Sequence, residues 1–183
     1  MKRLAILLLA LALPCAAAAT DYTVRPALSQ LNFQGTYQGA KFDGQFKDWT
    51  ATISYDPANL ANSKFDVTVT LASARTGDHD QDSALPGESF FNVEKFPTAH
   101  FVTSGFHREG KLVIADGELT LRGVTKPVSL GVVFRAASPT SATLDIAGHV
   151  QRLDFGVGSG DYADTSVIGP TVRITAHVQL ASK

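Results

Sequence analysis

Apolar and polar residues alternate along much of this chain. The alternation is clearest over residues 65–71, 128–134, 144–150 and 172–180, where every second residue is apolar or glycine. A repeat of two residues indicates β-strands with one face buried and the other face in water. Pro and Gly residues separate these runs at irregular intervals, and we expect about eight strands in all.

One pair of strands is expected to form a tight hairpin. The segments 118–122 and 125–131 have strand-like patterns, and Gly123 stands between them. Glycine adopts the positive φ angles that short reversals between antiparallel strands require. We therefore predict a hairpin that turns at Gly123 and Val124.

Two windows do not alternate. Residues 76–92 are polar, then small, then aromatic, and we expect a short helix near residues 80–85. This window ends in an aromatic lid that includes Phe90 and Phe91. Residues 153–169 are rich in Gly and Asp and are predicted to form a loop between the last two long strands.

The alternation leaves two architectures open. Antiparallel strands with one buried face can pack as a sandwich or close into a barrel, and their pattern is the same in both. A closed barrel of about eight strands leaves an interior just wide enough for side chains or for one slender ligand. The predicted fold class is therefore all-β and antiparallel, and periodicity alone does not decide whether the sheet closes.

Residues 1–19 have the pattern of a secretory signal peptide, with a basic start, an apolar run and small residues at the end. We expect cleavage after Ala19, so that residues 20–183 form one domain that is periplasmic or secreted. Lipid attachment at Cys15 is a less favoured alternative, because Pro14 stands where a lipoprotein signal has a small residue. On the favoured interpretation the mature chain has no cysteine and no apolar segment long enough to span a membrane as a helix.

The charge balance is mildly acidic. Removal of Lys2 and Arg3 leaves 14 basic and 17 acidic residues, a net charge of −3 with neutral histidines. Proteins that bind nucleic acids need clustered Lys and Arg to neutralise the phosphates. The charge balance therefore argues against a nucleic-acid partner.

Patterns typical of catalytic and metal sites are weak. Asp78, Asp80 and Asp82 resemble the start of a calcium loop, but Ser83 stands where that loop needs glycine. The five histidines show no metal-like spacing, and no serine stands in a nucleophile-elbow sequence. We therefore expect no enzymatic activity, no metal and no cofactor.

Three motifs carry a family resemblance. They are FxxxxFPTxxF at residues 91–101, GxLTLRGVTKPV at residues 117–128 and LDFGVG at residues 153–158. In this order they resemble the YceI-like family of periplasmic and secreted proteins, and looser similarity extends over nearly the whole mature chain. The resemblance implies a lipocalin-like antiparallel barrel of roughly eight strands, with a short helix and an aromatic lid segment, around a long apolar molecule.

Face parity and motif position predict the ligand contacts of such a barrel. The residues expected to line the tunnel or its lid are Phe33, Tyr37, Phe46, Trp49, Phe90, Phe91, Phe101, Leu119, Leu121 and Phe155. The Tyr37 hydroxyl is expected to donate a hydrogen bond inside the cavity.

Polar residues would decide which head group is accepted. The candidate head-group contacts are Arg75, Asp82 and Arg152. Many relatives carry basic residues in the segment that corresponds to residues 76–90, and Gln81, Ala84 and Pro86 stand there instead. This departure argues against recognition of a diphosphate.

The expected function is non-enzymatic binding, sequestration or transport of a long-chain apolar ligand in the periplasm. A polyisoprenoid, an isoprenoid quinone and a fatty amide or acid all fit this description. The alternative is an interaction module that docks a membrane redox protein, and the chain is also compatible with a homodimer. A lipid-modifying enzyme that uses Arg152 or Asp154 ranks third.

Overall fold

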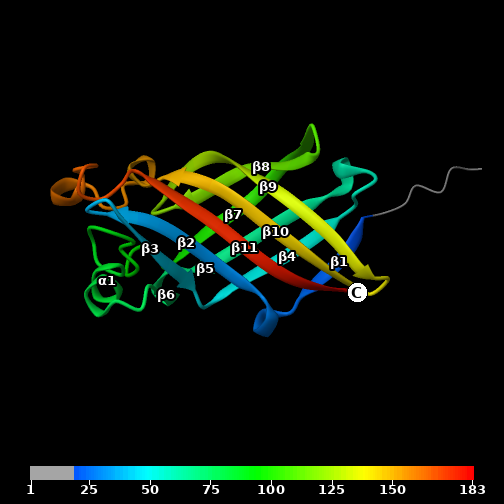
Figure 1. The fold of residues 1–183 in the computed structure, drawn as a ribbon, viewed down its shortest axis with the longest axis horizontal. Helices are drawn as coiled ribbons and strands as arrows, with labels where there is room; N and C mark the ends of the chain where they lie inside the picture. Colours follow the sequence, from blue (N-terminus) through cyan, green and yellow to red (C-terminus); the bar gives the residue numbers. More distant parts are fainter. Residues whose placement is uncertain (1–18) are drawn as a thin grey trace, which may run out of the picture.

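The computed structural model describes residues 19–183, which form an elongated antiparallel β-barrel (Figure 1). The strands are β1 (Thr20–Val24), β2 (Gln30–Tyr37), β3 (Ala40–Phe46), β4 (Trp49–Tyr55), β5 (Lys64–Thr70), β6 (Ala74–Arg75), β7 (Thr98–Glu109), β8 (Leu112–Leu121), β9 (Val124–Ser138), β10 (Ser141–Gln151) and β11 (Thr171–Ser182). The helices are α1 (His79–Ala84) and the 3₁₀ helices η1 (Pro26–Leu28), η2 (Leu60–Asn62), η3 (Leu71–Ser73), η4 (Arg152–Phe155) and η5 (Gly160–Tyr162). The predicted signal peptide, with Cys15, lies outside the described residues except for Ala19.

Eight of the strands described within residues 19–183 close the barrel. The hydrogen-bonded order β1-β4-β5-β7-β8-β9-β10-β11 returns to its start, because β1 also pairs with β11. In that closing pair Tyr22 lies opposite Ser182 and Val24 lies opposite Leu180. The prediction of an all-β, antiparallel barrel of roughly eight strands is confirmed.

A hairpin extends the wall at one end of the barrel. β11 pairs with two strands along the same edge. Its last residues pair with β1, and an earlier part pairs with β2, from Arg173 opposite Gln34 to His177 opposite Gln30. β3 pairs with β2, and β6 joins β3 at two positions. The helix α1 and the loop between β10 and β11 lie at this same end (Figure 1).

The two irregular windows and the tight hairpin also match the predictions. α1 occupies the first window, and the second contains η4 and η5 but no strand. The β8–β9 hairpin reverses through Arg122 and Gly123, whose φ angles of +51° and +74° are those of a type I′ turn. Because Leu121 already pairs with Val124, the turn lies one residue earlier than predicted.

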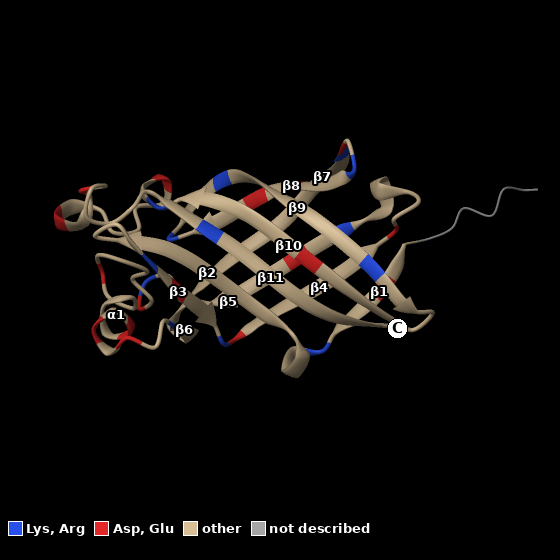
Figure 2. Ribbon diagram, viewed as in Figure 1, with Lys and Arg blue, Asp and Glu red and all other residues tan. Residues whose placement is uncertain are grey.

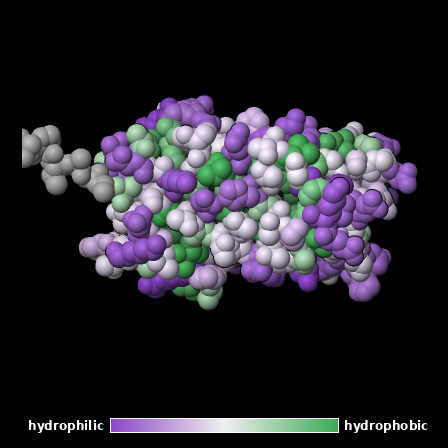
Figure 3. Space-filling view, turned by 180° about the vertical axis from the view of Figure 1, so that it is seen from behind, coloured by the Kyte–Doolittle hydropathy of each residue, from purple (hydrophilic) through white to green (hydrophobic). Residues whose placement is uncertain are grey.

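The barrel interior contains two apolar clusters, which come from inward-facing strand residues and, in the first cluster, also from η3, η4 and the segment after α1. The first cluster includes Phe33, Phe46, Leu71, Phe91, Leu121 and Phe155. The second includes Ile53, Tyr55, Phe65, Val132, Leu144 and Leu180. The outer face shown in Figure 3 is instead a mixture of hydrophilic and hydrophobic residues without one broad apolar area. None of the helices within residues 19–183 is long and apolar enough to cross a membrane.

Candidate ligand-binding cavity

A cavity of about 230 Å³ lies inside the barrel, in the half that carries α1 and the β10–β11 loop. Inward-facing residues of the strands form its wall, and residues from the segment after α1 and from the β10–β11 loop complete it. The lining is almost entirely apolar. Among the described residues that line it, only Thr36, Trp49 and Arg152 have side-chain nitrogen or oxygen atoms.

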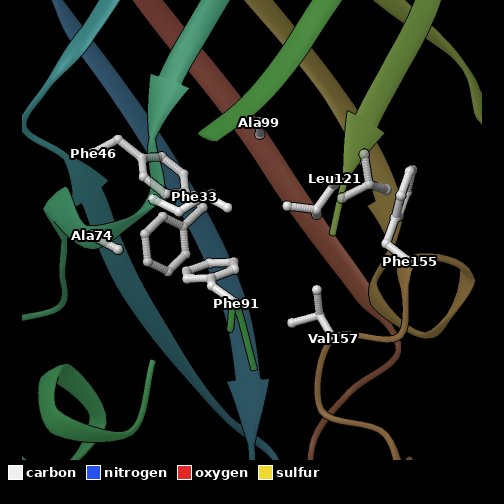
Figure 4. Packing of buried hydrophobic residues seen from close by; sticks show 10 residues of the cluster. Phe33, Phe46, Ala74, Phe91, Ala99, Leu121, Phe155 and Val157 are labelled. Carbon is white, nitrogen blue, oxygen red and sulfur yellow. The ribbon is translucent and has the colours of Figure 1, made fainter. Parts of the chain in front are cut away.

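Aromatic rings form one side of the cavity. The ring centroids of Phe33 and Phe46 are 5.0 Å apart, and those of Phe46 and Phe91 are 5.9 Å apart. Figure 4 shows these three rings grouped together, with Leu121 and Val157 across from them. Tilted ring pairs at such distances contribute about 0.5–1.5 kcal/mol beyond the area that they bury.

The segment 76–97, which we call the lid segment, begins with a capped helix. The Asp78 carboxylate accepts hydrogen bonds from the backbone amides of Asp80 (3.1 Å) and Gln81 (2.9 Å), as an N-cap residue does. The Asp82 carboxylate accepts from the backbone amide (2.6 Å) and hydroxyl (2.8 Å) of Thr76, which lowers the pKa of Asp82. The aspartates that resemble a calcium loop therefore include two that organise the start of the lid.

Phe90 and Phe91 of the lid segment close the open end of the cavity. The Phe91 amide donates to the Leu85 carbonyl (3.0 Å), which turns the chain back after α1 and brings both rings to the cavity wall. Phe91 is buried, and Phe90 is partly buried with its ring 4.9 Å from that of Tyr162 in the β10–β11 loop. The closure is therefore shared between the lid segment and the loop.

Arg152 holds the β10–β11 loop in place from the inside. Its side chain is buried, with 3% of its surface exposed, and all five of its N–H groups donate to backbone carbonyl oxygens. The bonds run from Nε to Gly169 (3.1 Å), from Nη1 to Val157 (3.0 Å) and Gly158 (2.5 Å), and from Nη2 to Tyr162 (2.9 Å) and Ile168 (2.8 Å). Burial lowers the pKa of this guanidinium, which nevertheless stays protonated at neutral pH.

A second arginine joins the lid segment to the same loop. Arg122, in the β8–β9 turn, donates from Nη2 to the Glu88 carbonyl (3.0 Å) and from Nη1 to the carbonyls of Ser89 (3.5 Å) and Gly156. The Gly158 amide also donates to the Ser89 carbonyl (2.7 Å). Lid segment, hairpin turn and loop therefore form one hydrogen-bonded cover over the cavity.

Inward-facing glycines make room for the large side chains of the wall. Phe33 lies opposite Gly44, and a Cβ atom added to that glycine would lie 2.1 Å from the Phe33 ring. A Cβ atom at Gly117 would likewise lie 2.7 Å from the Phe101 ring. Since real Cβ atoms do not approach other atoms so closely, these rings occupy space that only glycine leaves free. The rings lie over the glycines and form part of the cavity wall.

Substitution of Gly44 by alanine tests this arrangement. The new methyl group is expected to push the Phe33 ring out of its place, and such overpacking costs about 1–3 kcal/mol. Urea-induced unfolding followed by tryptophan fluorescence measures the change. Gly105→Ala is the matched control, because a Cβ atom there would have no neighbour within 4 Å. Equal stability of the two variants would contradict the proposed role of Gly44.

Comparison with known proteins agrees with this architecture. The family model described as the YceI-like domain matches residues 22–180. The chain belongs to the YceI-like domain family. A UPF0312 protein of Photorhabdus laumondii is 40% identical over 117 residues, which cover 61% of this chain and 61% of that protein. A UPF0312 protein of Vibrio vulnificus is 32% identical over 171 residues, which cover 86% of this chain and 90% of that one.

Solved structures show the same YceI-like fold. BcnA of Burkholderia cenocepacia superimposes with a TM-score of 0.81 at 28% identity, over 86% of this chain and 99% of BcnA. The YceI protein of Campylobacter jejuni gives a TM-score of 0.69 at 25% identity, over 76% of this chain and 84% of its own. A polyisoprenoid-binding domain of Saccharophagus degradans gives 0.69 at 15% identity, over 90% of this chain and 99% of that one, a likeness of fold alone.

Most of the ligand contacts predicted from the sequence meet around the cavity of this YceI-like domain. The predicted residues that line it are Phe33, Phe46, Trp49, Phe90, Phe91, Phe101, Leu119 and Leu121. Trp49 also borders a second pocket between β1 and β4. These residues remain candidates, because no bound ligand defines the contacts.

Two predicted residues lie elsewhere in the YceI-like domain. Tyr37 has the inward parity of β2, but it stands at the very end of that strand, past the cavity, and 46% of its surface is exposed. Its hydroxyl therefore does not donate inside the cavity. Phe155 is buried in the apolar cluster behind the wall and does not line the cavity (Figure 4).

The three candidate head-group contacts are already bonded within the protein. Arg75 donates from Nη1 to the carbonyls of Ala72 (2.9 Å) and Ala74 (2.6 Å), outside the cavity. Asp82 accepts its bonds from the lid segment, as described above. Arg152 alone borders the cavity, and its N–H groups all have backbone partners.

Sequence reasoning missed much of the wall of the YceI-like domain. The missed residues include Leu31, Ile53, Phe65, Ile146, Val172, Ile174 and Val178. Most of them stand on the apolar parity of alternating runs, so that the signal was present in the sequence.

Proposed function

We propose that this protein binds one long-chain apolar molecule, whose tail lies in the barrel cavity, and that it sequesters or carries this molecule without covalent chemistry. The observation that supports this most directly is the apolar, covered cavity itself, since apolar cavities of this kind stay dry and take up hydrocarbon ligands. The pattern of residues 1–19 supports action in the periplasm or outside the cell.

The cavity volume bears on the size of the ligand. A void of about 150 Å³ holds a six-carbon ring, so a cavity of about 230 Å³ encloses roughly nine carbons as it stands. Burial of nine carbons contributes roughly 7 kcal/mol, which lies at the low end of the 4–15 kcal/mol cost of association. Tight binding therefore needs a longer chain, and the lid segment or the loop must move to accommodate it.

The surroundings of the open end favour an uncharged head group. The N–H groups of Arg152 are all used, and within residues 19–183 no buried side-chain nitrogen or oxygen atom lacks a hydrogen-bond partner. The lid segment and the loop 152–170 together contain eight acidic residues against two Lys or Arg. Figure 2 shows acidic residues on α1 and in the loop at the same end. An anionic head group would meet repulsion from this acidic excess, and Arg152, the one cation among the described residues that line the cavity, has no free donor for it.

Organic extraction of the purified protein followed by mass spectrometry tests the function. We expect one long-chain lipid with an uncharged head group at close to one molecule per protein. Delipidated protein should then bind farnesol more tightly than farnesyl diphosphate, which has the same tail, by at least about tenfold. Failure to recover any lipid, together with no uptake of farnesol, would refute the proposed function. Preference for the diphosphate would refute only the uncharged head group.

A further inference from the structure

The cavity stops partway along the barrel, although the inward-facing residues continue. On β4, Ala51 and Ile53 line the cavity, whereas Tyr55, two residues further along, does not. On β11, Val178 lines it and Leu180 does not. Successive inward residues of a strand lie one level apart along the barrel, so these strands place the end of the cavity at the same depth.

Beyond that depth five aromatic rings fill the interior. We call Tyr22, Tyr55, Phe65, Phe106 and Phe134 the ring cluster. Centroid distances within it are 4.9 Å for Phe65 and Phe106, 4.9 Å for Tyr55 and Phe134, and 6.0 Å for Tyr55 and Phe65. The cavity is therefore blind, with packed rings at its inner end and the lid at its outer end.

Phe65 is the member of the ring cluster that borders the cavity. Its surface is 1% exposed, it lies opposite Ile53 in the β4–β5 pair, and both residues line the inner end. Tyr55, Phe106 and the other rings stand behind it and do not line the cavity. Phe65 is therefore the one aromatic ring of this cluster that faces the space for a ligand, beside Ile53.

We infer that Phe65 sets the length of apolar tail that the barrel can bury, and so acts as a specificity-determining residue. This inference rests on the proposed function. A tail that enters by the lid gains affinity with each carbon until its tip reaches the Phe65 ring. Carbons beyond the length that the cavity and the opened lid together enclose remain in water and add little. Affinity should therefore rise with tail length and then level off.

The test measures this plateau with a series of prenols of increasing length, from geraniol to geranylgeraniol and longer. Their dissociation constants are measured by displacement of a fluorescent fatty-acid probe from the delipidated full-length mature protein. Phe65→Ala deepens the cavity by about one isoprene unit, so the plateau moves to the next longer prenol. That prenol should bind at least about tenfold more tightly than it binds the unmodified protein.

Phe134→Ala is the matched control, since it removes the same ring from the same cluster, but Phe134 packs against Tyr55 and does not line the cavity. Its plateau should stay where it is in the unmodified protein. Ala176→Leu, one level above Val178 on β11, fills space near the floor and should move the plateau to a shorter prenol. If Phe65→Ala does not fold, this variant tests whether the inner end of the cavity limits the length of the bound tail.

The outcomes separate the two proposals. A plateau that stays unchanged in folded Phe65→Ala, or that moves equally in Phe134→Ala, overturns the role of Phe65 and leaves the binding function intact. If Phe65→Ala does not fold, an unchanged plateau in Ala176→Leu overturns it. Absence of binding of any prenol to the unmodified protein overturns the function itself.

Discussion

Replacement of Arg152 by methionine is expected to destabilise the protein by roughly 2–5 kcal/mol and to release a bound lipid. Methionine fills similar space but provides no donor. Five carbonyl oxygens of the β10–β11 loop lose their partner, and those of Val157 and Gly158 are bonded in a buried environment. Urea-induced unfolding gives the loss of stability, and lipid content after gel filtration gives the loss of retention.

Arg173→Met is the control for charge, because Arg173 is exposed on β11 and its replacement should change stability by less than about 0.5 kcal/mol. Arg152→Lys keeps the charge but offers three donors instead of a planar fork of five, so its stability should lie between the other two. If Arg152→Met unfolds at the same urea concentration as the unmodified protein, the loop does not depend on this side chain.

Substitution of Leu119 by arginine should abolish uptake of an apolar ligand, with at least about a hundredfold loss of affinity for farnesol. Leu119 lines the cavity on β8. A guanidinium at this position either loses its hydration or draws water into the cavity, and in both cases the apolar tail loses its site. Displacement of a fluorescent fatty-acid probe measures the affinity.

Glu118→Arg serves as the control for this substitution. Glu118 is the preceding residue of β8, it faces outward and it is exposed. The same new side chain on the opposite face should leave uptake unchanged. Circular dichroism confirms that both variants fold. Normal uptake by folded Leu119→Arg protein would remove Leu119 from the binding site.

The barrel and much of its wall could be predicted from local sequence. Alternation places Phe65, Leu119 and Ile174 on inward faces, because a strand exposes every second residue to the same side. The family motifs supplied closure of the sheet, which alternation cannot provide. Alternation shows which face of the sheet a residue occupies, but not its depth along the barrel axis. Tyr37 shares its parity with Phe33, and only the strand register shows that it stands past the cavity.

The role of Arg152 could not be predicted in this way. Its partners lie 5 to 17 residues away in a loop without a repeating pattern. Three glycines of that loop, Gly156, Gly158 and Gly160, have positive φ angles that set the directions of its carbonyl groups. A lone arginine after a strand resembles a surface charge in the sequence, and only the folded loop shows five acceptors around it.

The match of glycines to rings in the wall has an evolutionary consequence. Because Phe33 fills the place that Gly44 leaves empty, the free width inside the barrel depends on such residue pairs as well as on the number of strands. A homologue could exchange the two members of such a pair, or replace both by smaller residues. It would then accept a ligand of different width without any change in the backbone hydrogen bonds of the sheet.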